Sequence, residues 1–397
     1  MAARIAPMLT LEAFEALLEP RGQEALAAAE ARQPAPATLL ADLEALRSRF
    51  GADLAAVAIE MAMLRARAAA KFSRASQMYF TRDGLEQATS ETVARHRATR
   101  YRDCDHVWDL CCGVGGDLLQ LAAGGTEVTG VDLDPLRLRI AECNTAVYGV
   151  RDSVRFEQLD VAAWEPPEHT YIFFDPGRRR EGRRIFDPDH YQPPLGTIER
   201  WLSRADGIGV KVAPGIDYDA LPWRPHEVEV ISVDGDVKEA VLWFGRLTRG
   251  ERTATLLPHG ATLTATAVPR IAVEPPSAYL YEPDGAVIRA HLVEQLAAEL
   301  GATKIDEDIA FLSTGTLVAT PFARAFRVDE VLPFNLKRLR GRLRELGVGQ
   351  VVIKKRGSPI DPQMLERQLR LQGDRSAVIV LTHVMGKPSA IICDASG

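Results

Sequence analysis

The residues best suited to bind a ligand form a short acidic and glycine-rich stretch at positions 109–117, DLCCGVGGD. It follows the apolar pair Val107-Trp108 and leads into the helix-compatible residues DLLQLAA, so it predicts a sharp turn from a strand into a helix. Small residues let the backbone turn tightly and approach a ligand without a colliding side chain. In open α/β sheets ligands bind at this end of the strands, so the stretch predicts a ligand site.

Two classes of cofactor use such a turn, and the local residues favour one of them. A dinucleotide-binding turn needs a third small residue three positions after the second glycine, where this chain has Leu118. Asp109 and Asp117 also place negative charges where a pyrophosphate would lie. S-adenosylmethionine carries an ammonium and a sulfonium group and no phosphate, so acidic neighbours favour its binding. We therefore expect S-adenosylmethionine, with a nicotinamide-dependent dehydrogenase as a rival interpretation.

Two further acids end the next two predicted strands. VTGVDLDP reaches Asp132, 23 residues after Asp109, which is an offset suited to hydrogen bonds with ribose hydroxyls. VRFEQLD ends at Asp160, where a third strand would meet the adenine ring. The alternative is a plain Rossmann-like sheet in which these aspartates only cap helices.

A candidate reaction centre follows the fourth predicted strand, YIFF, as Asp175-Pro176. Proline holds the preceding residue extended and stops the strand, which places a carboxylate at the mouth of the crevice. The next eight residues, 177–184, contain five arginines, and Lys211 ends a later strand at the same edge. Arginine suits bidentate contacts with phosphate, so we expect a nucleic-acid contact here. A solvated loop that balances nearby acids is the alternative.

The surrounding elements predict an α/β fold with three domains. Residues 8–72 repeat apolar positions at helical spacing, with breaks at Pro34, Pro36 and Gly51, and predict a helical bundle. From about residue 80 short apolar strands alternate with helices, as in a doubly wound, Rossmann-like sheet. Strands and helices mix after residue 252 and end in a hairpin around Gly386. The expected domains are 1–78 (helical), 79–250 (Rossmann-like) and 251–397 (α+β).

Composition excludes several classes of protein. The chain has 397 residues, a formal charge of −6 and 26% charged residues, which describe a globular protein rather than a disordered or indiscriminate nucleic-acid-binding one. The most apolar helical stretch, 52–70, carries Glu60, Arg65 and Arg67, so we expect no membrane span. Five cysteines and the histidines show no metal-ligand spacing, so we expect no metal. The odd cysteine count and the absence of a secretory signal favour the cytoplasm.

The central region resembles the class I methyltransferases that use S-adenosylmethionine. Within them it is similar to the trimethylguanosine-synthase-like group, which shares the Cys-Gly-x-Gly-Gly turn, an acid-x-Asp-Pro second strand, and a following Asn and Tyr-Gly, here Asn144 and Tyr148-Gly149. The whole chain also resembles bacterial methyltransferases with a C-terminal THUMP-like domain. The features that carry this likeness are the helical N-terminus, the segment LEQATSETVARHRA, and a late Lys-Lys-Arg-Gly.

The resemblance implies a role for each candidate residue. The residues implied to bind the cofactor are Gln87, Thr89, Asp109, Cys111, Gly113, Gly115, Asp117, Asp132 and Asp160. Thr89 has a second interpretation as a helix cap. Asp175 and Pro176 correspond to the first half of an Asp-Pro-Pro-aromatic tetrad that binds a target amino group, from which Gly177 and Arg178 depart. The implied RNA contacts are Arg178, Arg179, Arg183, Arg184 and Lys211.

Together these observations predict an S-adenosylmethionine-dependent methyltransferase that modifies a base nitrogen of RNA. The central domain is expected to perform the chemistry, and the C-terminal domain to help capture a structured RNA. Two alternatives remain open from the sequence: a methyltransferase for small molecules, and a non-catalytic module that binds the cofactor and RNA.

Overall fold

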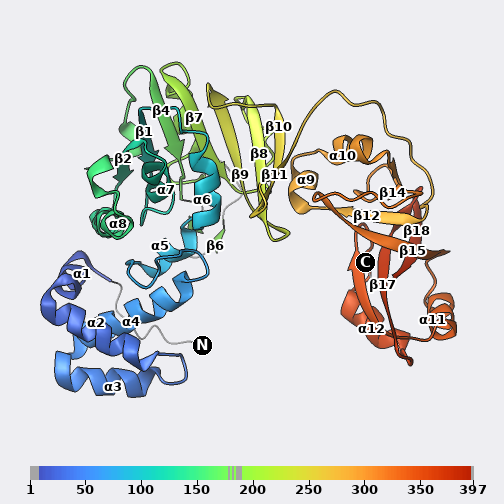
Figure 1. The fold of residues 1–397 in the computed structure, drawn as a ribbon, viewed down its shortest axis with the longest axis horizontal. Coiled ribbons are helices and arrows are strands. Elements are labelled where there is room, and N and C mark those ends of the chain that lie inside the picture. The colour runs from blue at the N-terminus through green and yellow to red at the C-terminus, as the bar shows by residue number, and fades with distance from the viewer. Residues whose placement is uncertain (1–8, 178, 181–182, 185–189, 395–397) are drawn as a thin grey trace. The chain divides into compact units, whose positions relative to one another are not determined.

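A computed structural model of the chain describes residues 9–177, 179–180, 183–184 and 190–394, with the backbone alone at 179–180 and 183–184. The chain divides into two compact units (Figure 1). Unit 1 contains Met1–His226 and Val241–Arg249, and unit 2 contains Glu227–Ala240 and Gly250–Gly397. Each unit is described by itself below. Within the described residues, no helix is both long and apolar enough to cross a membrane.

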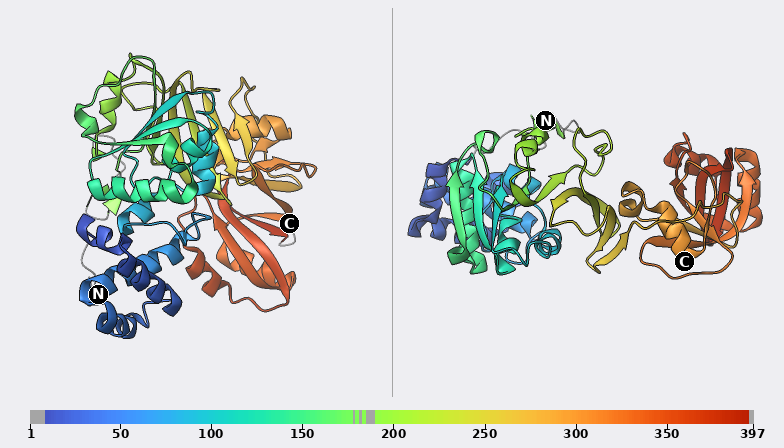
Figure 2. Two further views of the ribbon diagram at one scale, coloured as in Figure 1. Left: turned by 60° about the vertical axis from the view of Figure 1, so that its left-hand side comes forward. Right: turned by 90° about the horizontal axis from the view of Figure 1, so that it is seen from above.

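Unit 1 begins with four helices, seen as the blue group in Figures 1 and 2. They are α1 (Leu11–Leu18), α2 (Pro20–Arg32), α3 (Leu39–Phe50) and α4 (Ala52–Ala68). Thr10 caps α1 by accepting a hydrogen bond from the amide of Ala13, and Pro20 occupies the first turn of α2, where no amide partner is needed. Gly51 separates α3 from α4 with a φ of 89°. The helices expected at the N-terminus are therefore confirmed.

The core of this bundle continues into the next part of the unit. Phe14 and Leu17 of α1 belong to the same hydrophobic cluster as Leu119 and Ile140, which lie on α7 (Leu118–Ala123) and α8 (Pro135–Tyr148). Tyr79, in the segment after α4, meets the ring of Phe14 edge-on with centroids 5.4 Å apart. The bundle is therefore packed on the two helices that flank the glycine-rich turn.

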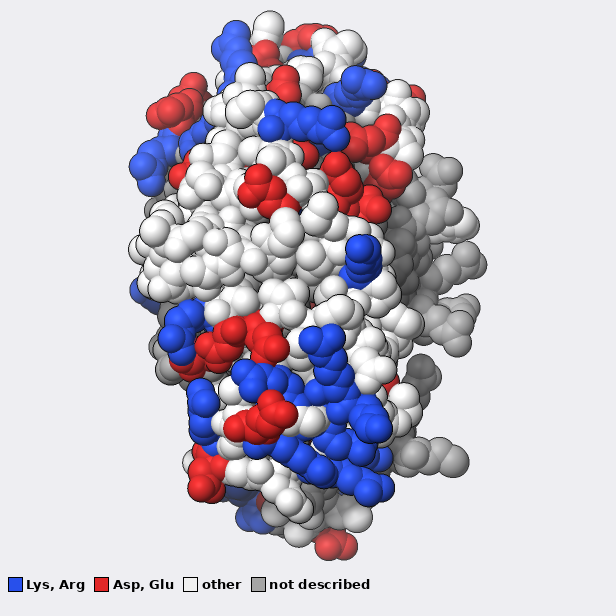
Figure 3. All heavy atoms as spheres, turned by 90° about the vertical axis from the view of Figure 1, so that its right-hand side faces the viewer, with Lys and Arg blue, Asp and Glu red and all other residues white. Residues whose placement is uncertain are grey.

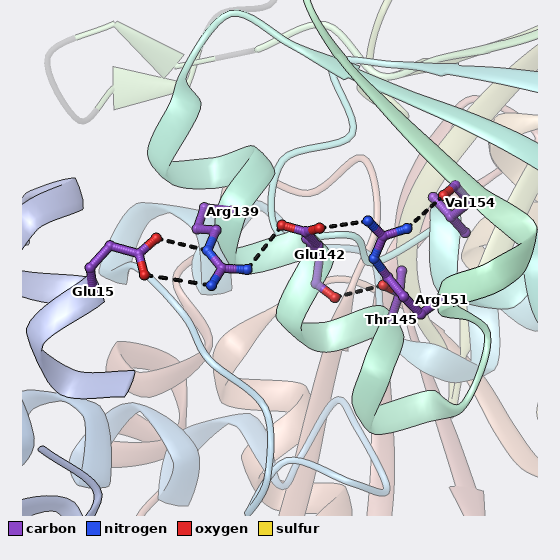
Figure 4. A network of polar contacts seen from close by, with 6 residues as sticks. All are labelled: Glu15, Arg139, Glu142, Thr145, Arg151 and Val154. Carbon is purple, nitrogen blue, oxygen red and sulfur yellow. Dashed lines mark hydrogen bonds and ion pairs between the residues drawn. The ribbon is translucent and has the colours of Figure 1, made fainter. Parts of the chain in front are cut away.

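Polar contacts reinforce the same junction (Figure 4). Glu15 of α1 accepts a 2.7 Å hydrogen bond from Nε of Arg139 on α8, and Arg139 also donates to Glu142 at 2.9 Å. Arg151, in the short 3-10 helix η1 (Arg151–Ser153), donates to the other oxygen of Glu142 at 2.6 Å. These side chains are about one third to one half exposed, so each pair contributes little beside the apolar core.

A parallel sheet forms the centre of unit 1. Its strands are β1 (His106–Leu110), β2 (Glu127–Asp132), β3 (Val154–Gln158), β4 (Thr170–Phe174) and β7 (Ala205–Val212), in the order β7-β4-β1-β2-β3. Asp109 lies beside Gly130 of β2 and Phe173 of β4. Two short helices, α5 (Arg82–Gln87) and α6 (Glu91–Ala98), precede β1. The expected Rossmann-like parallel sheet is confirmed.

The connections differ from expectation in one place. The alternation of strands and helices predicts an α-helix between β4 and β7, but Leu195–Arg200 form the 3-10 helix η4. A second 3-10 helix, η2 (Val161–Ala163), follows β3.

The sheet continues through β9 (Asp236–Gly245), β8 (Glu227–Val233), β10 (Arg252–Leu257) and β11 (Ala261–Thr264), so the full order is β11-β10-β8-β9-β7-β4-β1-β2-β3. β8 and β9 are joined by two residues and are neighbours in the sheet. The predicted boundary between residues 250 and 251 falls just before β10, which pairs in parallel with β8. A strand pattern in the sequence does not reveal its pairing partner, so the extension of the sheet past residue 250 was not visible there.

Unit 2 also contains a seven-stranded sheet with the order β13-β14-β12-β15-β18-β17-β16. Its strands are β12 (Tyr279–Pro283), β13 (Thr303–Lys304), β14 (Leu312–Thr314), β15 (Ala323–Pro333), β16 (Val348–Lys355), β17 (Arg375–Val384) and β18 (Lys387–Asp394). Its helices are α9 (Gly285–Arg289), α10 (Val293–Leu300), α11 (Leu336–Glu345) and α12 (Pro362–Leu369). β17 and β18 form the hairpin expected around Gly386, where Met385 and Gly386 both have positive φ.

Alternating residues of β17 belong to two separate hydrophobic clusters. Ile379 and Leu381 cluster with Leu339 of α11 and Leu365 of α12, whereas Val380 clusters with residues of β12 and β15. Successive strand residues point to opposite faces, so this sheet is covered on both faces.

We predict that the apolar core, and not the ion pairs of Figure 4, holds the bundle in place. Phe14→Ala should lower the free energy of unfolding of unit 1 by about 3–5 kcal/mol, because it leaves a cavity among fully buried residues. Glu15→Gln, the neighbouring control, should lower it by less than about 1 kcal/mol. Urea denaturation of both variants measures the difference. Equal losses of unfolding free energy in the two variants would show that the ion pairs stabilise the junction as much as the apolar core does.

Candidate functional site

A cavity of about 690 Å³ opens at the carboxyl ends of β1, β2, β4 and β7 in unit 1. This volume lies within the usual range for small-molecule sites. It brings together most of the residues selected from the sequence. The cavity is lined by Gln87, Thr89, Asp109, Cys111, Gly113, Asp117, Asp132, Asp160, Asp175, Pro176 and Lys211.

The glycine-rich turn forms the floor of the cavity through unusual backbone angles. Cys111, Gly113 and Gly115 have φ values of 65°, 57° and 92°, in the left-handed region that favours glycine. A Cβ atom added at Gly116 would lie 3.1 Å from the carbonyl oxygen of Thr89, so this glycine permits a close crossing of two segments. A Cβ atom added at Gly115 would lie 3.5 Å from Cβ of Ala141 on α8, an ordinary contact distance, so the φ of this residue favours glycine more than the space around it does. Burial raises the pKa of the Cys111 thiol well above its usual range.

The acids at the next two strand ends differ in their surroundings. Asp132 is buried, and its two oxygens accept hydrogen bonds from the amides of Gly113 and Asp134, both at 3.0 Å. It therefore fixes the turn and also faces the cavity. Asp160 is exposed and accepts from the amide of Ala162 at 2.9 Å, which caps η2. Both retain lone pairs for a ligand, and their roles toward ribose and adenine stay predictions.

Asp109 lies in an unfavourable environment for a charged carboxylate. It is 1% exposed, and neither side-chain oxygen has a hydrogen-bond partner among the described residues. Burial raises the pKa of Asp109 to about 7, and the nearby carboxylate of Asp175 adds to the rise, while Arg97 and Lys211 oppose it. A buried carboxylate without donors favours a ligand that brings both positive charge and N–H groups.

The segment between α5 and α6, residues 88–90, passes over the turn, and we call it the strap. Lys71 anchors its start by donating from Nζ to the carbonyl oxygens of Leu85 and Ala88, both at 2.8 Å. Asn144 of α8 is fully buried and donates to the carbonyl of Val114 in the turn at 2.9 Å. The strap and the turn are therefore each held by a buried or half-buried polar side chain.

Asp117, predicted to bind the cofactor, lines the cavity and is also engaged in the protein. Its carboxylate accepts a hydrogen bond from Arg97 of α6, which is 1% exposed. The guanidinium of Arg97 stacks 4.3 Å from the ring centre of Phe173. This buried pair ties α6 to the beginning of α7, directly after the glycine-rich turn.

Asp175 and Pro176, the predicted reaction centre, line the cavity immediately after β4. Lys211 was expected at the rim as a cation for phosphate. The structure instead buries its side chain, which is 3% exposed, and its Nζ donates to Oδ2 of Asp175 at 2.6 Å and to Oγ1 of Thr89 at 2.8 Å. A buried ammonium held in this way differs from the rim cation that the sequence predicted.

The arginine-rich stretch forms a short hairpin. β5 (Arg179–Arg180) and β6 (Arg183–Arg184) pair antiparallel, with Arg179 opposite Arg184. Arg178 lies outside the described residues. The predicted contacts of these arginines with RNA remain a prediction.

Sequence reasoning missed the residues that follow this hairpin. Gly177 and Gln192 exchange two backbone hydrogen bonds, of 2.8 and 3.0 Å, and so return the chain to the cavity. His190 and Tyr191 then line the cavity beside Pro176. Arg137 of α8 lines the cavity as well. Tyr191 followed by Gln-Pro-Pro was the available clue, because an aromatic residue beside prolines resembles the missing half of the tetrad.

The residues present fit S-adenosylmethionine. Asp109 offers unpartnered carboxylate oxygens for an ammonium group, and the small residues of the turn leave room for a chain that carries it. Asp132 and Asp160 lie along the same cavity for the nucleoside. In the described part of the chain, no group of three or more His, Cys, Asp or Glu side chains is arranged to hold a metal ion.

We predict that Asp109 makes the ligand-free protein less stable as the pH rises. Its pKa is about 7 in the folded chain and near 3.8 in the unfolded chain, so the folded state keeps a proton that the unfolded state loses. The resulting stability is complete below about pH 4 and is lost as the pH rises to about 7. Asp109→Asn should remove this dependence, which is of the order of a few kcal/mol. Melting temperatures at pH 5 and pH 8 for both proteins test this, and parallel pH dependences would contradict it.

Comparisons with known proteins match three parts of the chain to described families. Residues 104–197 match the family described as RNA cap guanine-N2 methyltransferase, and residues 323–395 match the THUMP domain-like family. Residues 10–68 match a domain of unknown function. The matched regions cover β1 to η4, β15 to β18, and the N-terminal bundle.

Whole-chain similarity is found as well. The chain is 37% identical over 367 residues, covering 88% of this chain and all of the relative, to an uncharacterised S-adenosylmethionine-dependent methyltransferase of Mycobacterium tuberculosis. A 23S rRNA (uracil(747)-C(5))-methyltransferase of Vibrio cholerae is 33% identical over 82 residues, 20% of this chain and 22% of that protein.

A crystal structure described as a methyltransferase from Porphyromonas gingivalis W83 aligns with a TM-score of 0.72 and 21% identity, over 94% of this chain and 99% of that one. This likeness confirms the fold. The identity and coverage of the mycobacterial relative show that the chain belongs to the S-adenosylmethionine-dependent methyltransferases.

Proposed function

We propose that this methyltransferase modifies an amino nitrogen of a base in a structured RNA. The observation that carries the proposal is the carboxylate of Asp175, which follows β4 at the cavity and is held by a buried lysine. A fixed carboxylate beside a cofactor cavity is suited to accept hydrogen bonds from an N–H group. The match of residues 104–197 to a guanine-N2 methyltransferase family supports an exocyclic amino group as the target.

In the proposed reaction, the protein mainly positions the acceptor. When bound, S-adenosylmethionine supplies a methyl group on a positively charged sulfur. Asp175 would accept a hydrogen bond from the amino group, and the carbonyl beside Pro176 would accept a second, so that the nitrogen lone pair faces the methyl group. His190 and Tyr191 line the cavity next to these residues and provide rings beside a planar base. Asp109 and the turn would hold the cofactor at the other end.

Features of unit 2 also support RNA as the substrate. α11 presents Lys337, Arg338 and Arg344 as exposed residues, while Leu339 and Leu343 on its other side are buried in the core. Figure 3 shows Lys and Arg side chains gathered on the lower part of one face of unit 2. A helix with a cationic exposed face is suited to the phosphate backbone. The match of residues 323–395 to the THUMP domain-like family and the partial similarity to an rRNA methyltransferase support RNA.

The same proposal places the protein in the cytoplasm. All five cysteines are free thiols, in keeping with the reducing environment that the sequence predicted.

Incubation with methyl-labelled cofactor and total bacterial RNA tests the function directly. We expect label in RNA, and digestion to nucleosides should place it on an amino nitrogen. Asp175→Ala should reduce incorporation by about a hundredfold or more, because the acceptor loses its positioning group, while affinity for S-adenosylhomocysteine changes by less than about threefold.

Asp236→Ala, at the exposed first residue of β9, is the matched control and should keep full activity. Full activity of Asp175→Ala would place the reaction centre elsewhere. Label in small molecules alone would favour a small-molecule methyltransferase, and cofactor binding without any methylated product would favour a non-catalytic module.

Basic residues should determine the salt dependence of RNA binding. Two sets of substitutions test this: Glu at Lys337, Arg338 and Arg344, and Ala at Arg178, Arg179, Arg183 and Arg184. Each set should weaken binding and reduce the slope of log affinity against log salt by about one for each phosphate contact that is lost. Filter binding from low to moderate salt measures the slope.

The matched control for the Glu set replaces three exposed arginines of the N-terminal bundle, Arg21, Arg47 and Arg49, by Glu, for the same change in net charge. An equal loss of binding in the control would show that net charge alone matters. An unchanged slope in either test set would remove that set from the RNA contact.

A further inference from the structure

Lys211 lies where two strands and the strap meet. In the parallel pairing of β4 with β7, Phe174 lies beside Val210, so the next residues, Asp175 and Lys211, are also side by side. Nζ of Lys211 donates to Asp175 at 2.6 Å and to Thr89 of the strap at 2.8 Å. One buried ammonium therefore contacts the reaction carboxylate and the segment that crosses the cofactor turn.

Because Lys211 is buried, its ammonium group depends on these two contacts. The residue is 2% exposed, and a buried ammonium is unfavourable unless charged and polar partners compensate it. Asp175 provides the opposite charge, and the Thr89 hydroxyl provides a second acceptor. The positive charge also lowers the pKa of the neighbouring Asp109, although burial dominates there. A surface lysine that only contributed to RNA affinity would not require this arrangement.

The two carboxylate oxygens of Asp175 have different roles in this arrangement. Oδ2 accepts from Lys211, so Oδ1 is the oxygen left to accept from a substrate amino group. A carboxylate held by one oxygen cannot rotate freely, and its second lone-pair direction is fixed in the cavity. This is the condition under which a hydrogen bond orients a nitrogen lone pair.

The contact with Thr89 extends the effect to the cofactor side. Backbone atoms of Thr89 lie 3.1 and 3.3 Å from the position of a Cβ atom on Gly116, so the strap rests directly on the glycine-rich turn. Lys71 holds the strap from its other side, at the carbonyl oxygens of residues 85, 86 and 88. Lys211 thus fixes the strap at the point where it faces the reaction centre.

We infer that Lys211 is a positioning residue for methyl transfer, which fixes Asp175 toward the acceptor and anchors the strap over the cofactor turn. This inference rests on the proposed function for its catalytic half. Its structural half concerns the strap and holds for the ligand-free chain.

Three variants of the full-length protein separate these roles. Lys211→Ala removes the ammonium and leaves space for a small amine. Lys211→Met keeps the volume without the charge and serves where the alanine variant fails to fold. Thr89→Val removes only the strap contact and leaves the Lys211–Asp175 pair in place. Lys238→Ala, at an exposed position near the start of β9, is the matched lysine control and should behave as the parent protein.

Turnover on total bacterial RNA gives the catalytic readout. Lys211→Ala should lower kcat by about fiftyfold or more, with a loss of S-adenosylhomocysteine affinity below about tenfold by calorimetry. Propylammonium chloride, which replaces the missing three methylenes and ammonium, should restore at least about tenfold of the loss, whereas sodium chloride should not. Thr89→Val should lower kcat less than Lys211→Ala does, because it leaves the Lys211–Asp175 pair in place. Unchanged kcat in Lys211→Ala, or equal losses of kcat and affinity without amine rescue, would overturn the inference.

Hydrogen–deuterium exchange of the ligand-free proteins gives the structural readout. Residues 85–91 should exchange faster in Lys211→Ala, Lys211→Met and Thr89→Val than in the parent and in Lys238→Ala. Unchanged exchange in all three would overturn the anchoring role. If the parent protein labels no RNA, the proposed function fails, and the exchange measurement still decides whether Lys211 anchors the strap.

Discussion

Unit 1 is organised around negative charge buried at the tips of its central strands. Asp109 has lost its contact with water and has no hydrogen-bond donor, while Asp132 and Asp175 add to the negative potential around it. The two nearest cations are already engaged, Arg97 with Asp117 and Lys211 with Asp175. Among the described residues no donor binds the oxygens of Asp109, and this favours a cationic cofactor over one that carries phosphates.

The cofactor half of the site was largely predictable from the sequence. A glycine-rich turn and acids that end successive strands are local patterns, and the fold then brings strand ends together at one edge. The same patterns could not reveal that Asp117 is bonded to Arg97, because the two residues lie 20 positions apart on separate helices. Gly115 also resembled its neighbours in the sequence, although it packs against α8 while Gly113 faces the cavity.

The reaction half was less predictable for a physical reason. Lys211 meets Thr89 across 122 residues, and only the register of β4 with β7 places it beside Asp175. In the sequence a lysine at a strand end is equally compatible with an exposed rim or a buried pair. The same limit applies to β10, whose residues predict a strand but not its partner β8. Patterns along the chain determine element types, whereas pairing and burial depend on contacts between distant residues.

The shared hydrophobic cluster of the N-terminal bundle has a consequence for how this architecture can be divided. Phe14 and Leu17 cover the outer sides of Leu119 and Ile140, which belong to the helices next to the cofactor turn. A sheet domain truncated at residue 78 would expose this apolar surface to water and would be prone to aggregation. Because the bundle and the sheet helices share one apolar core, they depend on each other for burial and cannot be exchanged as independent modules.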